Sequence, residues 1–177
     1  YASHVAGASS PMAQGAAAGV DRALAWLEKA LPSGAKIVMT ADHGLVDYAK
    51  SEVYSIDPSD PLMAYVDHEP WGTGRTMSFA CKRGAEADFE GLFRERFREG
   101  FYLLTIDELK ELELYGPGPL SPVMARRVGT HMAVSKGAWL MDYDYPKVRD
   151  EAQEEHEAVS QHGGLTPAEM LVPMVVA

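Results

Sequence analysis

The stretch IVMTADHGLVDY, residues 37–48, decides the fold that we expect for this chain. Its first three residues, Ile37–Met39, form an apolar run bounded by turn residues, which predicts a buried strand. Asp42 and His43 follow where the strand gives way to a turn, and Gly44 has no β-carbon to restrict the backbone there. The stretch therefore predicts a strand that delivers a carboxylate and an imidazole to a site. A structural turn with a helix-capping aspartate is the alternative interpretation.

Composition narrows the class of protein. The 177 residues, 46% hydrophobic and 24% charged, suffice for one core, most simply a single α/β domain over residues 1–177. No apolar run approaches the roughly 20 residues of a membrane helix, so we expect no membrane partner. The formal net charge of -10 argues against nonspecific attraction to nucleic-acid duplexes or anionic membranes. It still allows a small phosphate substrate, because bound divalent cations would reverse the sign of the local field.

The single cysteine, Cys81, cannot form an internal disulfide. This is compatible with a reducing compartment such as the cytoplasm, without establishing one.

Helix and strand signals alternate through the first half of the chain. A helix is expected to begin at Pro11, behind one of two serine caps, and to end before Pro32, because its apolar residues recur at helical spacing. The passage from this helix to the strand at residue 37 is typical of a parallel sheet. Leu62–Val66 and Arg75–Lys82 predict the two strands of a small antiparallel hairpin. We therefore expect an α/β fold with a mainly parallel sheet, flanked by helices, and one such hairpin.

The second half continues the alternation. An aromatic stripe in residues 89–97 predicts a helix packed on the core. Thr105 and Glu108 predict a capping box that starts another helix. Val128–Val134 and Ala138–Met141 are consistent with strands. These elements fit the same α/β class.

Three histidines have ordinary structural explanations. His68 lies in a loop beside a proline and two glycines, where an imidazole is usually solvated. His131 falls within an expected strand, where a packed or hydrogen-bonded histidine is the default. His156 belongs to the acidic run Asp150–Glu157, which a solvated helix face explains. We interpret none of the three as a ligand.

A second histidine motif closes the chain, SQHGGLTPAEMLVPMVVA, residues 160–177. The two glycines after His162 let the backbone turn tightly beside the imidazole. Thr166 and Glu169 then supply the cap and the capping-box acid of a short helix. A final apolar run suits an edge strand, because Pro173 lacks a backbone donor. On these residues alone, a histidine in a glycine turn before a capped helix explains the motif.

Together, the motifs TADHG and HGGLTPAEMLVP resemble the alkaline-phosphatase superfamily, in particular its type I phosphodiesterase/nucleotide pyrophosphatase branch. The resemblance implies two neighbouring divalent metals, commonly zinc, at the carboxyl ends of a mainly parallel sheet. It implies that Asp42 and His43 bind one metal and that His162 binds the other. His4, followed by Gly7 and two serines, matches the histidine that accompanies His162 at the second metal.

The same resemblance indicates which family elements these residues lack. An aspartate of the second metal would fall immediately before Tyr1, and an aspartate that completes the first metal site is also missing. The Thr or Ser nucleophile is missing as well. The aspartate of the first metal site and this nucleophile both belong to the family's N-terminal half. We therefore expect the chain to be the C-terminal portion of a larger catalytic domain, with the N-terminal half of the same protein as its partner. Alone, it should show little or no turnover.

The activity implied by the resemblance is metal-dependent hydrolysis of phosphodiester or nucleotide pyrophosphate bonds in a small phosphate ester or nucleotide. The donor types agree, because a mixture of imidazole nitrogen and carboxylate oxygen suits zinc or manganese better than magnesium. Two metals about 4 Å apart can clamp both the attacking and the leaving oxygen at phosphorus. Two alternatives stay open: a phosphomonoesterase or phosphomutase of the same superfamily, and a noncatalytic binding or assembly domain on the same scaffold.

Overall fold

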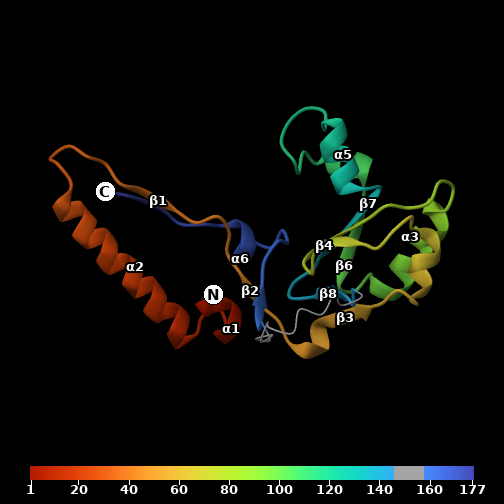
Figure 1. Ribbon diagram of the computed structural model, residues 1–177, viewed down its shortest axis with the longest axis horizontal. Coiled ribbons are helices and arrows are strands. Elements are labelled where there is room, and N and C mark those ends of the chain that lie inside the picture. The colour runs from red at the N-terminus through yellow and green to blue at the C-terminus, as the bar shows by residue number, and fades with distance from the viewer. Residues whose placement is uncertain (146–157) are drawn as a thin grey trace. The chain divides into compact units, whose positions relative to one another are not determined.

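A computed structural model describes residues 1–145 and 158–177 of the chain (Figure 1). The chain divides into two compact units. Unit 1 combines Tyr1–Tyr48 with Gln153–Ala177, and unit 2 is Ala49–Ala152. The predicted single domain stays a prediction. Among the described residues, no helix combines the length and the apolarity that crossing a bilayer requires.

The acidic run Asp150–Glu157, with His156, lies outside the part of the chain that the structure describes. Its interpretation as a solvated helix face stays a prediction.

Unit 1 joins the beginning and the end of the chain by two antiparallel strand pairs, β1 with β10 and β2 with β9. The C-terminal segment therefore folds back onto the first part of the sequence. The elements of unit 1 are α1 (Ala2–Ala6), α2 (Pro11–Ala30), β1 (Val38–Thr40), β2 (Val46–Asp47), β9 (Ser160–Gln161), α6 (Pro167–Met170) and β10 (Met174–Val176).

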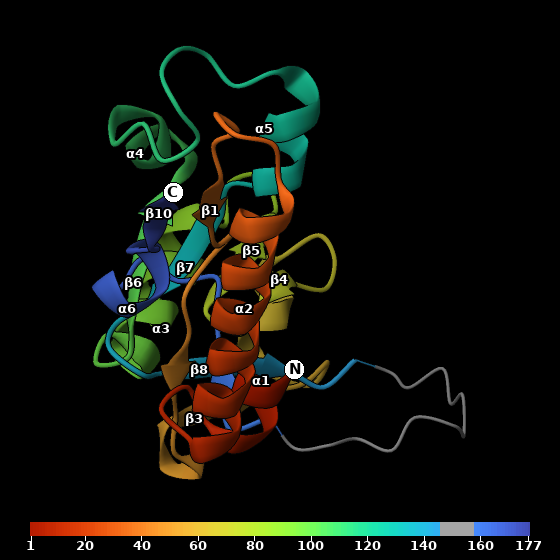
Figure 2. The same ribbon diagram turned by 90° about the vertical axis from the view of Figure 1, so that its left-hand side faces the viewer.

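The predicted N-terminal helix is confirmed as α2, the long helix in Figure 2. The Ser10 hydroxyl accepts a hydrogen bond from Ala13 N at 3.1 Å, and Pro11 takes the first helical position, where its missing N–H costs nothing. Leu24 of this helix and Val175 of β10 help to line a cavity of about 170 Å³. The helix and the strand pair thus border the same cavity.

The strand predicted from the apolar run is also confirmed, as β1, but its predicted burial is wrong. Val38 is 66% exposed, and Met39 pairs with Val175 of β10 in an antiparallel ladder. Among the described strands, β3 with β8 is the one parallel pair, so a mainly parallel sheet is not confirmed. An apolar run predicts a strand but carries no information about the direction of its partner.

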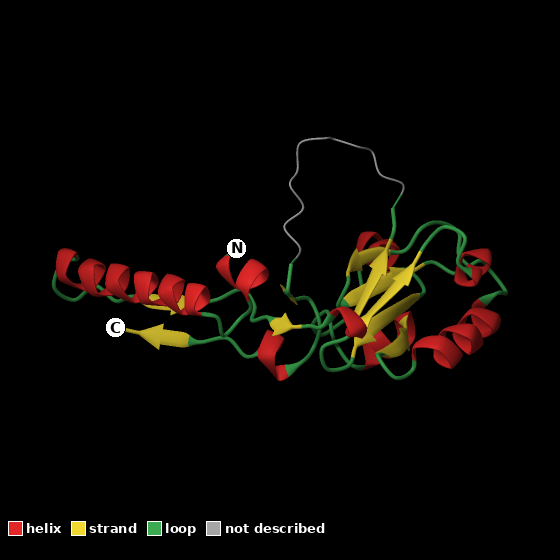
Figure 3. Cartoon of the chain, turned by 90° about the horizontal axis from the view of Figure 1, so that it is seen from below, coloured by secondary structure: helices red, strands yellow, loops and turns green. Residues whose placement is uncertain are grey.

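Unit 2 is organised around a four-stranded antiparallel sheet, whose strands are yellow in Figure 3. Its strand order is β4-β5-β7-β6, and the parallel pair β3 and β8 belongs to the same unit. Its elements are the 3₁₀ turns η1 (Lys50–Glu52) and η2 (Pro61–Tyr65), the helices α3 (Glu86–Phe97), α4 (Ile106–Glu111) and α5 (Pro122–Val128), and the strands β3 (Val53–Ile56), β4 (Trp71–Thr73), β5 (Thr76–Phe79), β6 (Phe101–Thr105), β7 (His131–Ser135) and β8 (Leu140–Tyr143).

The predicted hairpin exists, but one of its strands was misplaced. Leu62–Val66 was predicted as a strand, whereas η2 occupies most of it, because Asp60 caps Leu62 N at 2.9 Å and Pro61 starts a helical turn. The hairpin is formed by β4 and β5 instead. A short apolar run does not distinguish a strand from a helical turn.

The core of unit 2 rests on the predicted aromatic stripe of α3. Phe89, Phe93 and Phe97 are all buried, and the first two pack against Phe79 of β5 with ring centroids 5.1 and 5.9 Å away. These tilted and edge-to-face contacts are favourable for aromatic rings. The stripe is therefore core packing, as predicted.

His131 is a packed strand residue, as predicted. Its Nδ1 lies 3.0 Å from Thr130 Oγ1 and 3.3 Å from Cys81 Sγ, and its Nε2 donates to Glu90 Oε1 at 3.2 Å. Burial raises the pKa of the Cys81 thiol, which disfavours the thiolate. The hydrogen-bonded cluster of His131, Thr130, Cys81 and Glu90 therefore stabilises the core of unit 2, and Cys81 is not an activated nucleophile.

An ion pair joins η2 to α3. Arg96 donates to both carboxylate oxygens of Asp60, at 2.6 and 2.7 Å. Burial opposes ionisation of Asp60, but the hydrogen bonds from Arg96 and Leu62 N and the guanidinium charge together lower its pKa. A bidentate pair of this kind is among the stronger polar contacts in proteins.

Replacing Asp60 by Asn should lower the free energy of unfolding by about 2 kcal/mol at pH 7, because the amide keeps the cap but loses the charged pair. The pKa of Asp60 is lowered in the fold, so its contribution is present above the unfolded value of about 3.9 and is lost as the pH falls through the folded value. Urea unfolding at several pH values measures this. The exposed pair of Asp107 and Lys110 is the control: Asp107→Asn should change stability by less than about 0.5 kcal/mol.

Candidate metal centre

The four predicted ligands all lie in unit 1, next to its paired elements. His4 is on α1, Asp42 and His43 occupy the turn between β1 and β2, and His162 directly follows β9. Strand pairing therefore determines how close these side chains can come.

His4 is held by the C-terminal segment through both its main chain and its ring. Its carbonyl accepts from Val159 N at 2.7 Å, and its Nδ1 contacts Ser160 O at 2.9 Å. Ser160 is fully buried, and its hydroxyl donates to Ser3 O at 2.6 Å. Because a carbonyl oxygen only accepts, Nδ1 of His4 must carry a proton, which leaves the lone pair of a neutral ring on Nε2.

His43 has the same arrangement. Its Nδ1 donates to Gly44 O at 2.8 Å, so the lone pair of its neutral ring is also on Nε2. Asp42 Oδ1 accepts from His43 N at 3.0 Å, and Asp42 Oδ2 lies 3.6 Å from His43 Nε2. The Asp42 side chain is 87% exposed and that of His43 is 32% exposed. The carboxylate and the imidazole nitrogen are thus close together and open to a ligand.

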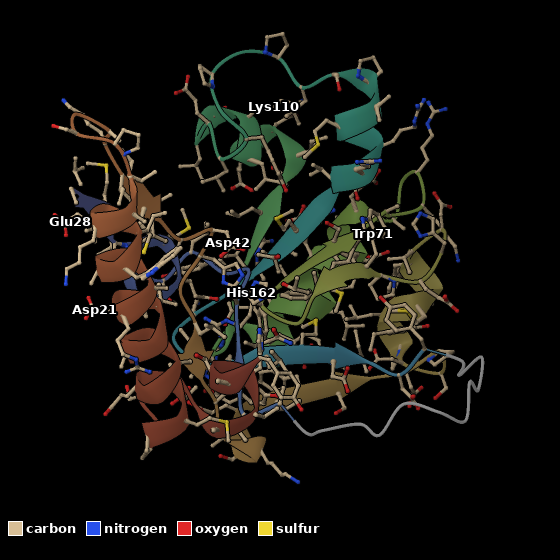
Figure 4. All side chains as sticks on the ribbon, turned by 60° about the vertical axis from the view of Figure 1, so that its left-hand side comes forward. Asp21, Glu28, Asp42, Trp71, Lys110 and His162 are labelled. Atoms are coloured by element: carbon tan, nitrogen blue, oxygen red, sulfur yellow. The ribbon has the colours of Figure 1, made fainter. Side chains whose placement is uncertain are left out.

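The imidazoles of His4 and His43 both contact that of His162. The rings of His43 and His162 are stacked, with centroids 3.6 Å apart and planes 15° from parallel. The ring of His4 meets His162 edge-on at 5.3 Å. Asp42 and His162 are both labelled in Figure 4. Residues separated by most of the sequence therefore come together in one part of unit 1.

The surroundings of His162 favour its neutral form. Burial lowers the pKa of His162, and the neighbouring His43 and His4 lower it further, against the opposite effects of Asp42 and Glu169. A neutral imidazole is the form that binds a metal.

The donor set fits a divalent metal in its chemistry, because it combines imidazole nitrogen with carboxylate oxygen and fixes the tautomer of two rings. Within the described residues, however, no group of three or more His, Cys, Asp or Glu side chains is arranged to hold a metal ion. The four candidate ligands therefore do not by themselves form a complete coordination sphere in the described structure.

Gly44 is required for a reason that its sequence context did not reveal. Its φ is not positive, so backbone freedom does not explain it. Instead, a β-carbon at this position would lie 1.9 Å from Ala168 O, and Gly44 N donates to Glu169 O at 2.8 Å. The glycine allows α6 to approach the turn that carries Asp42 and His43.

Two other contributors to the site were missed from the sequence. Ser160 orients His4, as described above, and Asp47 accepts from Ala8 N at 2.7 Å beside Gly7. Ser160 acts through its carbonyl on His4, and a main-chain contact leaves no pattern in the sequence. Asp47 could have been suspected, because it is an acidic residue shortly after the turn that carries His43.

The chain is similar to solved structures of known proteins, but not to known families or proteins by sequence. Neither a protein family nor a curated protein sequence matches the chain. Murine ectonucleotide pyrophosphatase/phosphodiesterase 5 is similar with a TM-score of 0.70 and 17% identity, over 98% of this chain and 43% of that one. The human protein gives 0.71 and 14%, with the same coverage. Phosphonoacetate hydrolase from Sinorhizobium meliloti gives 0.69 and 22%, over 99% of this chain and 43% of that one.

The predicted resemblance to the alkaline-phosphatase superfamily is thus confirmed at the level of the fold. The chain spans less than half the length of these solved structures and corresponds to their C-terminal portion.

Substituting Gly44 by Ala should destabilise unit 1 by about 2 kcal/mol, because the new methyl group forces the turn away from α6. Gly15 provides a matched control in the same unit, since a β-carbon there meets no atom within 4 Å. Gly15→Ala should raise stability by about 0.5–1 kcal/mol, because alanine favours a helix interior. Urea unfolding monitored by circular dichroism compares the two variants. Equal stability of Gly44→Ala and the parent would contradict the role of this contact.

Proposed function

We propose that the whole protein is a metal-dependent hydrolase of phosphodiester or nucleotide pyrophosphate bonds, and that this chain supplies part of its two-metal site. The observation that carries the proposal is the gathering of His4, His43 and His162 from three separate segments of unit 1, with Asp42 beside His43. Partly buried histidines have no general reason to cluster, because neighbouring imidazoles disfavour one another's protonation.

In this proposal Asp42 and His43 bind one metal, and His4 and His162 bind the other. Both ions are zinc, or manganese in its place, because the donor types suit these metals. When bound, such a pair lowers the pKa of a hydroxyl nucleophile and neutralises charge on the phosphoryl oxygens. The carbonyls of Ser160 and Gly44 hold Nδ1 of His4 and His43, so Nε2 is the nitrogen with which each ring would bind its metal. A Thr or Ser nucleophile would come from the N-terminal half of the same protein.

The names of the structural neighbours support the substrate class. One is a nucleotide pyrophosphatase/phosphodiesterase, which has also been solved as an inactive variant in complex with AMP. Another is a phosphonoacetate hydrolase, solved with phosphonoformate. A small phosphorus-containing anion is common to both. Because this chain has a formal net charge of -10, bound metal cations would supply the positive charge that attracts such an anionic substrate.

The full-length protein should hydrolyse bis(p-nitrophenyl) phosphate in the presence of zinc. Changing Asp42, His43 or His162 to Ala should lower kcat/KM on the order of 1,000-fold, because each change removes a metal ligand. His68→Ala is the control, since this exposed histidine lies in unit 2 against Trp71 and should leave the rate unchanged.

Full activity of a variant with all three residues changed would end the proposal. Parallel assays with p-nitrophenyl phosphate and phosphonoacetate decide the class of bond, because faster cleavage of the monoester would favour the phosphomonoesterase alternative. The 177-residue chain alone should show little or no turnover.

Zinc should bind the 177-residue chain weakly, and the affinity should fall with decreasing pH because protons compete for the imidazoles. The lowered pKa of His162 means that this ligand stays neutral to a more acidic pH than an unperturbed histidine with a pKa of about 6.5. Calorimetric titration between pH 8 and pH 5, with the His162→Ala variant as control, measures the effect. A noncatalytic scaffold need not bind zinc, so no binding at any pH would favour that alternative.

A further inference from the structure

Glu169 is a carboxylate buried beside the candidate metal centre. It is the third residue of α6 and is 2% exposed. Burying a carboxylate is costly unless hydrogen bonds satisfy its oxygens. The hydrogen bonds of Glu169 therefore indicate which parts of unit 1 its buried carboxylate stabilises.

The carboxylate holds the loop that follows His162. Glu169 Oε1 accepts from Gly164 N at 2.8 Å, and Oε2 accepts from the Thr166 hydroxyl at 2.6 Å and from Thr166 N at 3.3 Å. A β-carbon on Gly164 would lie 2.8 Å from Oε2, so a larger residue there would push the carboxylate aside. The second glycine of the histidine motif thus makes room for the carboxylate.

The main chain of the same residue holds the other ligand-bearing turn. Glu169 O accepts from Gly44 N at 2.8 Å, and Gly44 directly follows His43. Its preceding neighbour, Ala168, places its carbonyl where a β-carbon of Gly44 would be. One residue therefore bonds to the His162 loop with its side chain and to the His43 turn with its carbonyl.

We propose that Glu169 is the positioning residue that sets the separation of the His43 and His162 turns, and thereby of the two halves of the metal centre. The juxtaposition that it maintains is the stack of the two rings at 3.6 Å. The inference rests on the proposed metal function, but the position of the rings can be measured without metal.

Both carboxylate oxygens of Glu169 are needed for this role, because each of them accepts a hydrogen bond. In Glu169→Gln one oxygen becomes an NH₂ group, which cannot accept from a backbone N–H. A capping box tolerates Gln as well as Glu, so the cap of α6 alone would be little affected. The substitution therefore separates positioning from helix capping.

The chain contains a matched control. Glu108 forms the same Thr-x-x-Glu capping box at α4 in unit 2, where its Oε2 accepts from Thr105 N at 2.7 Å and from the Thr105 hydroxyl at 2.9 Å. It is exposed, and it makes no contact with a candidate ligand in the described structure. Glu108→Gln reproduces the effect on a cap without the effect on the metal centre.

Proton NMR of the imidazole rings in the metal-free 177-residue chain, at constant pH, tests the proposal. Stacked rings shift each other's protons upfield, and Glu169→Gln should move the His43 and His162 signals downfield toward those of an unstacked histidine. Zinc affinity, measured by calorimetry, should fall about 10- to 100-fold. Glu108→Gln should leave both quantities unchanged.

Unchanged ring signals and zinc affinity in Glu169→Gln would overturn the proposal and leave Glu169 as an ordinary helix cap. If that variant does not fold, Gly164→Ala decides the matter, since its methyl group displaces the carboxylate while keeping its charge. It should produce the same downfield movement, and unchanged signals would again overturn the proposal. Failure of the parent chain to bind zinc would count against the proposed function alone, because the ring signals need no metal.

Discussion

The candidate site depends on the antiparallel pairing of the C-terminal segment with the first part of the chain. Ile37 and Ala177 exchange two backbone hydrogen bonds, at 2.8 and 3.0 Å, and β2 and β9 form a second pair. Closing so long a stretch of chain costs conformational entropy, which these ladders and the contact of α6 with Gly44 must offset. Without the pairing, His4 and His162 would have no reason to meet.

Local signals predicted local structure well. The Ser10 cap with its proline, the aromatic stripe of α3 and the capping box at Thr105 each depend on neighbouring residues, and the structure has all three. Long-range features were less accessible. The exposure of Val38 and the antiparallel partner of β1 depend on distant parts of the chain, and the 3₁₀ turn at Leu62 replaced a predicted strand because a short apolar run is ambiguous.

The candidate site shows the same division. The residue types and the glycine turns pointed to His43 and His162, and the family resemblance added His4. The sequence also indicated Glu169, but only as a capping residue, because Thr-x-x-Glu is a complete explanation for its presence. Its carbonyl bond to Gly44 is independent of side-chain identity, so no reading of the sequence could have revealed it.

The dual attachment of α6 has a thermodynamic consequence. Two turns that share one four-residue helix cannot relax independently, because a displacement of either is transmitted through the same peptide units. If the two turns bind metals as proposed, loading the first position would alter the affinity of the second, and linkage would require the reverse effect to be equal in size. Cooperative occupancy would then arise from backbone geometry and would need no direct contact between the ions.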